Sequence, residues 1–249
     1  MDSTLLINSI NRKQPTSSVS DKENRHLAEV YKDFSAQKKE NRYIQLLHPC
    51  SVTSKSSHSG AILPPISLAY LAATLRGAGY PVKIIEAQGD DIFKIRLSEC
   101  GDYNIQGLST EEIIARIKPE TKILGVTLLY SYEWLIQRDV IKAIKARFPK
   151  IIIVVGGEHP TALPEYVLRD CPEVDFIVSG EGEFTLLQLV SSIFYSKEFR
   201  SIPGISYINK KGQFASNGLS SRIAHIDDIP RPAWDLCNVE NYFQPNWSM

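Results

Sequence analysis

Cysteine is scarce in this sequence, and no two cysteines lie close together. Cys50, Cys100, Cys171 and Cys237 are separated by dozens of residues, whereas zinc sites and iron–sulfur clusters commonly draw ligands from Cys-x-x-Cys or similar short spacings. We therefore expect four isolated, reduced thiols, as is usual in the cytoplasm. No iron–sulfur cluster is expected in this chain.

Net charge and long apolar runs are also lacking. Lys plus Arg and Asp plus Glu number 28 each, and no long basic block is present, so the sequence does not favour nucleic acid as a partner. The longest apolar stretch, residues 61–75, is broken by two prolines, which predicts no membrane span. The first eight residues lack the basic and apolar regions of a secretory signal, so we expect a cytoplasmic location.

Three common nucleotide-binding and catalytic motifs are absent. Residues 48–60 contain only Gly60, whereas a dinucleotide-binding domain needs Gly-x-Gly-x-x-Gly after its first strand. The sequence also has no phosphate-binding loop ending in Gly-Lys-Ser/Thr and no Gly-x-Ser-x-Gly nucleophile elbow. We predict no catalytic residues, and we interpret Glu86, at the end of a predicted strand, as solvated.

What the sequence does contain is an alternation of apolar strands and helices. With 43% hydrophobic residues the chain can bury a sizeable core, and its strands are continuous apolar runs, as in parallel sheets covered by helices on both faces. We predict an α/β fold, a Rossmann-like, doubly wound, parallel five-stranded sheet with flavodoxin-like strand order. The expected strands lie at 44–47, 82–85 and 122–127 and in the runs that begin at Ile151 and Asp175. The expected helices lie at 67–77, after Ser109, after Ser131, at 164–169 and at 185–195. Glu112 completes a capping box with Ser109.

The two ends of the chain do not follow this pattern. Residues 1–40 are mostly polar, with a weak helical pattern around Leu27 to Phe34, which predicts a flexible leader. Residues 205–208 and 213–215 flank a turn and predict a β-hairpin, and the proline-rich residues 226–235 resemble a connector. We divide the chain into a leader (1–40), a Rossmann-like domain (41–198) and a hairpin with connector (199–249).

Two glycine motifs follow neighbouring strands, and they mark the expected site. Gly156-Gly157-Glu158-His159 and Gly180-Glu181-Gly182-Glu183 each end an apolar run, and ligands bind beyond the carboxyl ends of strands in open α/β sheets. Glycines leave room for a large ligand, although a tight turn requires them equally well. The glutamates can accept hydrogen bonds from a ligand, or they can complement the positive end of the following helix.

The end of the third predicted strand reaches the same edge. Thr127, Leu129, Tyr130 and Ser131 are candidates there, although N-cap chemistry explains Ser131 equally well. His159 follows the glycine pair, but a lone loop histidine is more often solvated than bound to a ligand. His48 and His58 follow the first strand and are weak candidates for metal ligands.

Four separated segments together resemble a known family. They are Pro65–Tyr80, Val154-Val-Gly-Gly-Glu-His-Pro-Thr161, Val178-Ser-Gly-Glu-Gly-Glu183 and Asp227-Asp-Ile-Pro-Arg-Pro-Ala-Trp234. In this order they resemble the amino-terminal, cobalamin-binding (B12-binding) half of cobalamin-dependent radical S-adenosylmethionine (SAM) proteins, over about residues 43–234.

The resemblance implies a cobalamin-binding module without its catalytic domain. In that family a radical SAM barrel with a Cys-x-x-x-Cys-x-x-Cys motif follows the connector, and this sequence has no such motif. The implied chain is a truncated relative, a split gene product or a fragment that presents cobalamin to a radical SAM domain or partner chain, and is not an enzyme by itself. The Asp-x-His-x-x-Gly motif of methionine synthase is also absent, which leaves the cobalt ligand unassigned.

The resemblance places the nucleotide tail of cobalamin between the strand ends and the corrin ring over the sheet edge. The candidate cofactor-binding residues are Thr127, Leu129, Tyr130, Ser131, Gly156, Gly157, Glu158, His159, Gly180, Glu181, Gly182 and Glu183. One alternative is a cofactor-free interaction or regulatory domain of the same fold that docks through its hairpin and the segment from Trp234 to Trp247. Another is a small-molecule transferase that uses Glu181, Glu183 and His159.

Overall fold

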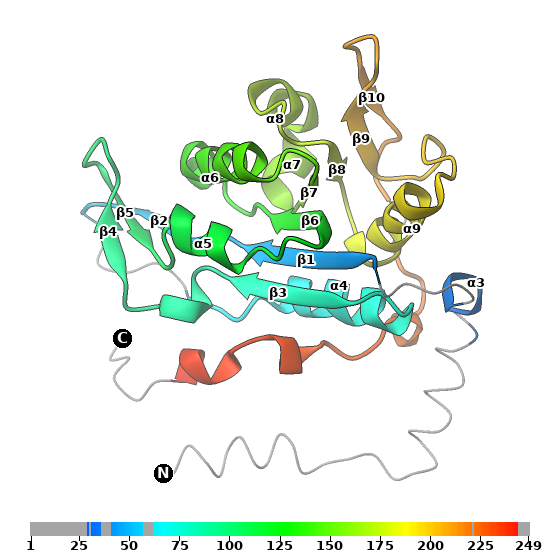
Figure 1. Cartoon of the computed structure of the whole chain (residues 1–249), viewed down its shortest axis with the longest axis horizontal. Coiled ribbons are helices and arrows are strands. Elements are labelled where there is room, and N and C mark those ends of the chain that lie inside the picture. Colours follow the sequence, from blue (N-terminus) through cyan, green and yellow to red (C-terminus); the bar gives the residue numbers. More distant parts are fainter. Residues whose placement is uncertain (1–28, 30, 36–40, 57–61, 221, 244–249) are drawn as a thin grey trace.

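The central sheet of the computed structural model contains five parallel strands in the predicted order. The structure describes residues 29, 31–35, 41–56, 62–220 and 222–243. The parallel strands lie in the order β3-β1-β6-β7-β8, which is the flavodoxin-like order, so that prediction is confirmed (Figure 1). Their bounds are Tyr43–His48 (β1), Val82–Glu86 (β3), Thr121–Thr127 (β6), Ile152–Gly156 (β7) and Phe176–Val178 (β8).

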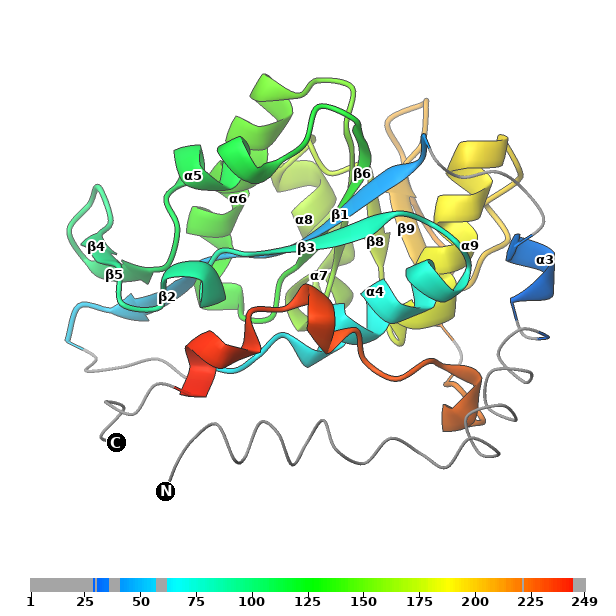
Figure 2. The same ribbon diagram turned by 60° about the horizontal axis from the view of Figure 1, so that its bottom comes forward.

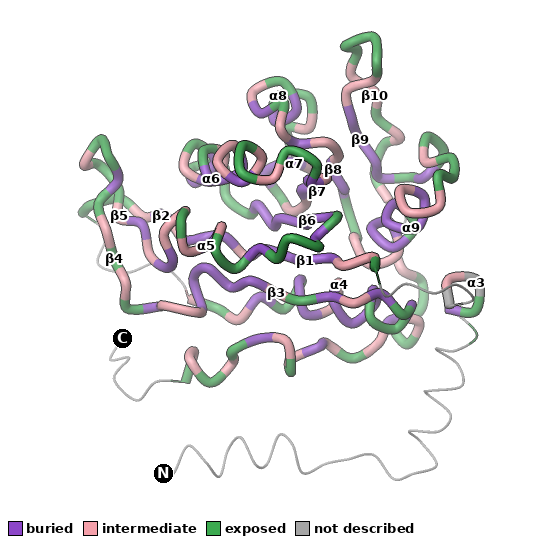
Figure 3. The backbone as a smooth tube through the Cα atoms, viewed as in Figure 1, coloured by how far each residue is buried: buried purple, intermediate pink, exposed green. Residues whose placement is uncertain are grey.

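Helices cover both faces of this sheet, as the continuous apolar strands predict. One face carries α4 (Ile66–Gly77) and α9 (Gly182–Tyr195), whose side chains pack with Leu46 in one core cluster. The opposite face carries α5 (Thr110–Arg116), α6 (Trp134–Arg147) and α8 (Pro164–Asp170), which pack with Leu47 in a second cluster. Figure 2 shows α4 and α9 together, and Figure 3 shows buried residues along the central strands. The short α7 (Glu158–Ala162) follows β7.

The predicted hairpin is present, and it extends the central sheet. Its strands are β9 (Ile205–Ile208) and β10 (Phe214–Ser216), and β9 pairs antiparallel with β8. The sheet therefore has seven strands, in the order β10-β9-β8-β7-β6-β1-β3, instead of the five predicted. Pairing with β9 covers an edge of β8 that would otherwise present unpaired backbone groups.

The structure also contains a second, three-stranded sheet that was not predicted from the sequence. It consists of β2 (Ser51–Ser54), β5 (Tyr103–Gln106) and β4 (Ile95–Leu97), all antiparallel. β2 is short and polar, and its pairing partner β5 lies about fifty residues away in the sequence, so no local pattern identifies it.

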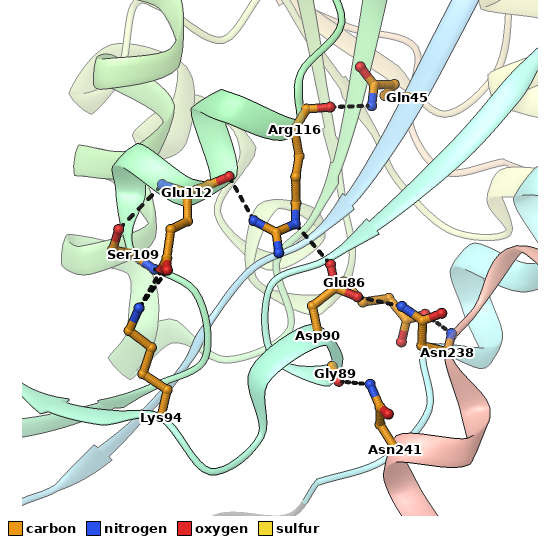
Figure 4. Close-up of polar contacts among 10 residues, drawn as sticks. All are labelled: Gln45, Glu86, Gly89, Asp90, Lys94, Ser109, Glu112, Arg116, Asn238 and Asn241. Carbon is orange, nitrogen blue, oxygen red and sulfur yellow. Dashed lines mark hydrogen bonds and ion pairs between the residues drawn. The ribbon is translucent and has the colours of Figure 1, made fainter.

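The predicted capping box of α5 is present. The Ser109 hydroxyl accepts from the Glu112 backbone N–H at 3.3 Å, and Glu112 Oε2 accepts from the Ser109 N–H at 2.7 Å. Lys94 binds the same carboxylate at 2.6 Å (Figure 4). The hydrogen bonds from Lys94 and from the Ser109 backbone lower the pKa of Glu112 to about 2. The helix predicted after Ser131 also forms, but its N-cap is Glu133, and Ser131 instead begins a 3-10 turn, η2 (Ser131–Glu133).

The carboxyl-terminal segment packs along α4 and beyond β3. It contains η3 (Ile226–Asp228), η4 (Trp234–Leu236) and η5 (Val239–Phe243), and we call residues 226–243 the strap. The Ala233 N–H donates to the carbonyl of Ala69 in α4 at 2.9 Å, and Arg76 of α4 binds Asp235 at 2.6 Å. The interaction-domain alternative uses the segment from Trp234 to Trp247 for docking. The described part of that segment packs on the chain's own fold (Figure 2).

The strap covers Glu86, so the interpretation of Glu86 as a solvated strand end is wrong. Glu86 is only 2% exposed, and it accepts from the backbone N–H of Asn238 at 2.7 Å and from the hydroxyl of Tyr242 at 2.8 Å. Asn238 and Asn241 also donate to Asp90 and to the carbonyl of Gly89 (Figure 4). The strap therefore provides the partners that a buried carboxylate requires.

We expect Tyr242→Phe to destabilise the fold by about 1–2 kcal/mol near pH 8, because the buried Glu86 carboxylate loses a donor. Burial raises the pKa of Glu86, so the folded chain keeps this proton to a higher pH than the unfolded chain, and stability falls as the pH rises through that interval. Loss of the Tyr242 donor raises the pKa further, so the deficit should be larger at pH 8 than at pH 5.

Urea-unfolding midpoints at the two pH values measure this difference. Tyr166→Phe, at an exposed tyrosine on α8, is the matched control. Its unfolding midpoint should equal that of the unmodified chain at both pH values. A deficit of Tyr242→Phe that does not change with pH would contradict the role of Glu86.

Among the described residues, no helix is both long enough and apolar enough to cross a membrane. The predicted leader lies mostly outside the described residues, and its described part includes the short α3 (Lys32–Ser35).

Candidate functional site

A cavity of about 260 Å³ lies where the sequence places the site, at the carboxyl ends of the parallel strands. Its walls come from β6, β7 and β8 and from the two helices on one face, α4 and α9. We call it the first cavity. Nine of the twelve candidate residues line it, namely Thr127, Leu129, Gly156, Gly157, Glu158, Gly180, Glu181, Gly182 and Glu183.

Two strand residues that line the cavity, Gly125 and Gly156, lack side chains at positions where neighbouring atoms leave little room for one. A Cβ added to Gly156 would lie 3.3 Å from the carbonyl oxygen of Val178, and one added to Gly125 would lie 2.7 Å from Leu46 Cδ2. Gly125 was not among the predicted site residues, although an isolated glycine inside a strand signals a close approach of backbone or ligand. The other lining residues that were not predicted are Leu46, Ser67, Leu68, Leu71, Val126, Val154, Val155, Val178 and Leu186.

Gly157 and Gly180 are also required by the turns themselves, which was the alternative interpretation. Gly157 has φ +111°, and an added Cβ would lie 2.5 Å from the carbonyl oxygen of Leu128. Gly180 has φ +86°, and its Cβ would lie 2.5 Å from Ser220 Oγ. Side chains rarely adopt such φ values, so these two glycines both shape the backbone and line the cavity.

The glutamates have different surroundings. Glu181 precedes α9 but makes no side-chain cap, and its carboxylate accepts from the Ile223 backbone N–H at 2.5 Å. Glu183 lies in the first turn of α9, as the helix-complementing interpretation predicts, and burial raises its pKa. Glu158 is exposed in the first turn of α7. Each of them also lines the first cavity.

Ser131 and His159 do not line the first cavity, and they contact each other instead. His159 Nδ1 lies 2.9 Å from Ser131 Oγ, and the imidazole packs against Trp134 at 5.1 Å between ring centroids. His159 is only 3% exposed, and burial lowers its pKa. The expectation that His159 is solvated is therefore wrong. The transferase alternative needs His159 beside Glu181 and Glu183, but His159 does not line the cavity that those glutamates line.

A second cavity of about 180 Å³ adjoins the first, with Ser67, Thr127 and Leu129 in both walls. It lies between the residues that follow β1 and β6, two adjacent strands, and we call it the switch-point cavity. Its other lining residues are His48, Pro49, Cys50, Ser51, Leu63, Pro64, Pro65, Ile66, Gln88, Tyr130, Glu133 and Gln137. Tyr130, the remaining candidate, thus lies here.

A buried carboxylate organises the switch-point cavity. Glu133 accepts from the backbone N–H of Val52 at 2.9 Å, from Ser51 Oγ at 3.3 Å and from Gln137 Nε2 at 3.0 Å. Burial raises its pKa. These bonds connect β2, which follows β1, to the start of α6, so the walls of the cavity are held together on both sides.

Metal ligands do not cluster in the described part of the chain, where no three His, Cys, Asp or Glu side chains are placed to share an ion. His48 lines the switch-point cavity, and burial lowers its pKa to about 4. His58, the other weak candidate, lies outside the described residues.

Comparison with known proteins identifies the family. The family model of the B12 binding domain matches residues 56–190. A methyltransferase of Pyrococcus horikoshii, described as uncharacterized, is 31% identical over 185 residues, which cover 74% of this chain and 36% of that protein. The cytidylyl-2-hydroxyethylphosphonate methyltransferase of Streptomyces wedmorensis is 25% identical over 202 residues, which cover 72% of this chain and 38% of that protein.

A solved structure shares the fold. The cobalamin-dependent SAM radical enzyme OxsB, with aqua-cobalamin and SAM bound, superposes with a TM-score of 0.62 at 20% identity, over 79% of this chain and 25% of that chain. This chain thus spans little more than a third of the length of each of these two relatives. On the match over residues 56–190, the chain belongs to the B12-binding domain family.

Proposed function

We propose that this chain binds cobalamin, with the nucleotide tail in the first cavity and the corrin ring over the carboxyl edge of the sheet. The observation that carries this proposal is the first cavity itself, in which glycines and aliphatic side chains form a slot between α4, α9 and the strand ends. A flat, apolar, bicyclic base such as the dimethylbenzimidazole of cobalamin suits such a slot.

The cavity also fits the polar part of the tail. Glu181 and Glu183 line it beside Gly180 and Gly182, and carboxylates accept hydrogen bonds from ribose hydroxyls. At about 260 Å³ the cavity is far smaller than the whole cofactor. The corrin ring therefore has to lie outside it, over the adjoining switch-point cavity.

We propose further that the corrin-bearing face meets a radical SAM domain, in the same or another chain. Exposed apolar side chains surround the switch-point cavity, namely Leu63, Ile66, Leu129 and Tyr130. Such a patch favours a partner surface. The relatives extend well beyond the matched region, and OxsB is a radical enzyme with cobalamin and SAM bound. Bound cobalamin would supply a cobalt centre for group transfer, while the chain's own residues bind and orient it.

Titration of the purified chain with hydroxocobalamin tests this function. We expect near-stoichiometric corrin to remain with the protein after desalting, and its visible spectrum to differ from that of the free cofactor. If no corrin is retained at high micromolar concentration, the cobalamin assignment is wrong for this chain, and the cofactor-free interaction domain becomes the better hypothesis.

A further inference from the structure

The switch-point cavity is a second polar site at the same edge of the sheet. The helices that follow β1 and β6 lie on opposite faces, α4 on one and α6 on the other. This divergence opens a crevice at the strand ends, and its walls include Ile66 and Ser67 from the first turn of α4 and Gln137 from the first turn of α6. Its walls contain three buried polar side chains that the first cavity lacks, those of Gln88, Glu133 and Gln137.

Gln137, in the wall of this cavity, has an unpaired acceptor. The residue is only 4% exposed, and its Nε2 donates to Glu133 Oε2 at 3.0 Å. A carboxylate can only accept, so this bond fixes which end of the amide faces Glu133. The other end, Oε1, is buried and has no hydrogen-bond partner. Buried acceptors are nearly always paired, so Gln137 is left needing an N–H donor.

His48 adds a second unpaired group in the same wall. Its Nδ1 is buried without a partner. Burial lowers the pKa of His48 to about 4, so the imidazole is neutral and offers one N–H donor and one acceptor. A ligand group that both donates and accepts hydrogen bonds therefore matches the two residues.

We propose that the switch-point cavity binds a primary carboxamide of the corrin periphery, whose N–H donates to Gln137 Oε1. This inference rests on the proposed cobalamin function and assigns a subsite within it. Cobalamin carries several carboxamide side chains around its ring, and the adjoining first cavity would hold the ring's tail. The cavity of about 180 Å³ has room for one such group.

Other ligand groups fit less well. A carboxylate has no N–H for Gln137 Oε1, and it would lie near the buried Glu133 carboxylate, which repels it. A methyl ester is one carbon larger than the amide and has no donor. The switch-point cavity should therefore distinguish a carboxamide from a carboxylate or an ester at the same position on the ring.

Gln137→Met tests the proposal because methionine keeps the length of the side chain but removes the acceptor. Dissociation constants are measured by visible titration for three corrins. Hydroxocobalamin and diaquacobinamide both carry the carboxamides, although cobinamide lacks the nucleotide tail, and heptamethyl cobyrinate carries methyl esters instead. We expect about tenfold weaker binding of both amide corrins and no change for the ester, since one hydrogen bond to a buried acceptor is lost.

Gln188→Met, at an exposed glutamine of α9, is the matched control and should bind all three corrins as the unmodified chain does. Equal weakening of amide and ester corrins by Gln137→Met would show a general disturbance of the site, and unchanged binding of the amide corrins would show no contact. Either result overturns the carboxamide subsite while leaving cobalamin binding intact. Failure of the unmodified chain to bind any corrin overturns the proposed function, and the subsite with it.

Discussion

A Ser67→Trp variant should bind cobalamin at least about a hundredfold more weakly than the unmodified chain. Ser67 is exposed in the first turn of α4, and it lines both the first cavity and the switch-point cavity. An indole at this position occupies the space through which the tail has to enter, while the buried core of α4 is unchanged. The affinity is measured by titration with hydroxocobalamin, with circular dichroism to confirm folding.

Ser201→Trp is the control for added bulk, because Ser201 is exposed and lines neither cavity. It should bind normally. Gly156→Leu obstructs the first cavity from the opposite wall, at the end of β7, and should also lose binding. If both Ser67→Trp and Gly156→Leu bind cobalamin as tightly as the unmodified chain, the tail does not occupy the first cavity.

Gly157→Ala should destabilise the fold by about 3 kcal/mol, because the substitution combines backbone strain with a steric clash. The φ of Gly157 is +111°, and the new Cβ would meet the Leu128 carbonyl oxygen at 2.5 Å. That carbonyl accepts from the His159 backbone N–H, so it cannot move without disturbing α7. We expect the thermal midpoint to fall by roughly 6–12 °C for a chain of this size.

Gly212→Ala separates strain from clash. Gly212 has φ +74° in the hairpin turn, but an added Cβ there meets nothing within 4 Å. Gly212→Ala should therefore lower the free energy of unfolding by only about 1 kcal/mol. The role assigned to Gly157 would be contradicted by thermal midpoints that are equal for the two variants.

Local patterns were sufficient for most of the central sheet and for the glycine motifs. The apolar runs of β6 and β7 and the capping box at Ser109 are visible within a few residues, and the parallel strands bring their carboxyl ends to one edge. That geometry is why candidates from three separate segments, such as Thr127, Gly156 and Gly180, line one cavity.

Residues whose role depends on distant partners were misjudged or missed. Ser131 was considered as an N-cap and His159 as solvated, but each is the other's partner across 28 positions. Glu86 was expected to be solvated because the strap that covers it lies about 150 residues away. Gln137 was not among the candidates, because no local pattern distinguishes it from other polar helix residues.

The sequence by itself determined the fold class, the order of the parallel strands and the edge of the sheet at which the first cavity lies, because hydrophobic periodicity and glycine turns are local properties. Only the tertiary structure decided which residues form each cavity wall, which buried polar groups have partners, and where the hairpin and the strap pack. Those depend on long-range pairings, such as β2 with β5 and Glu86 with Tyr242, whose residues carry no local pattern that identifies the partner.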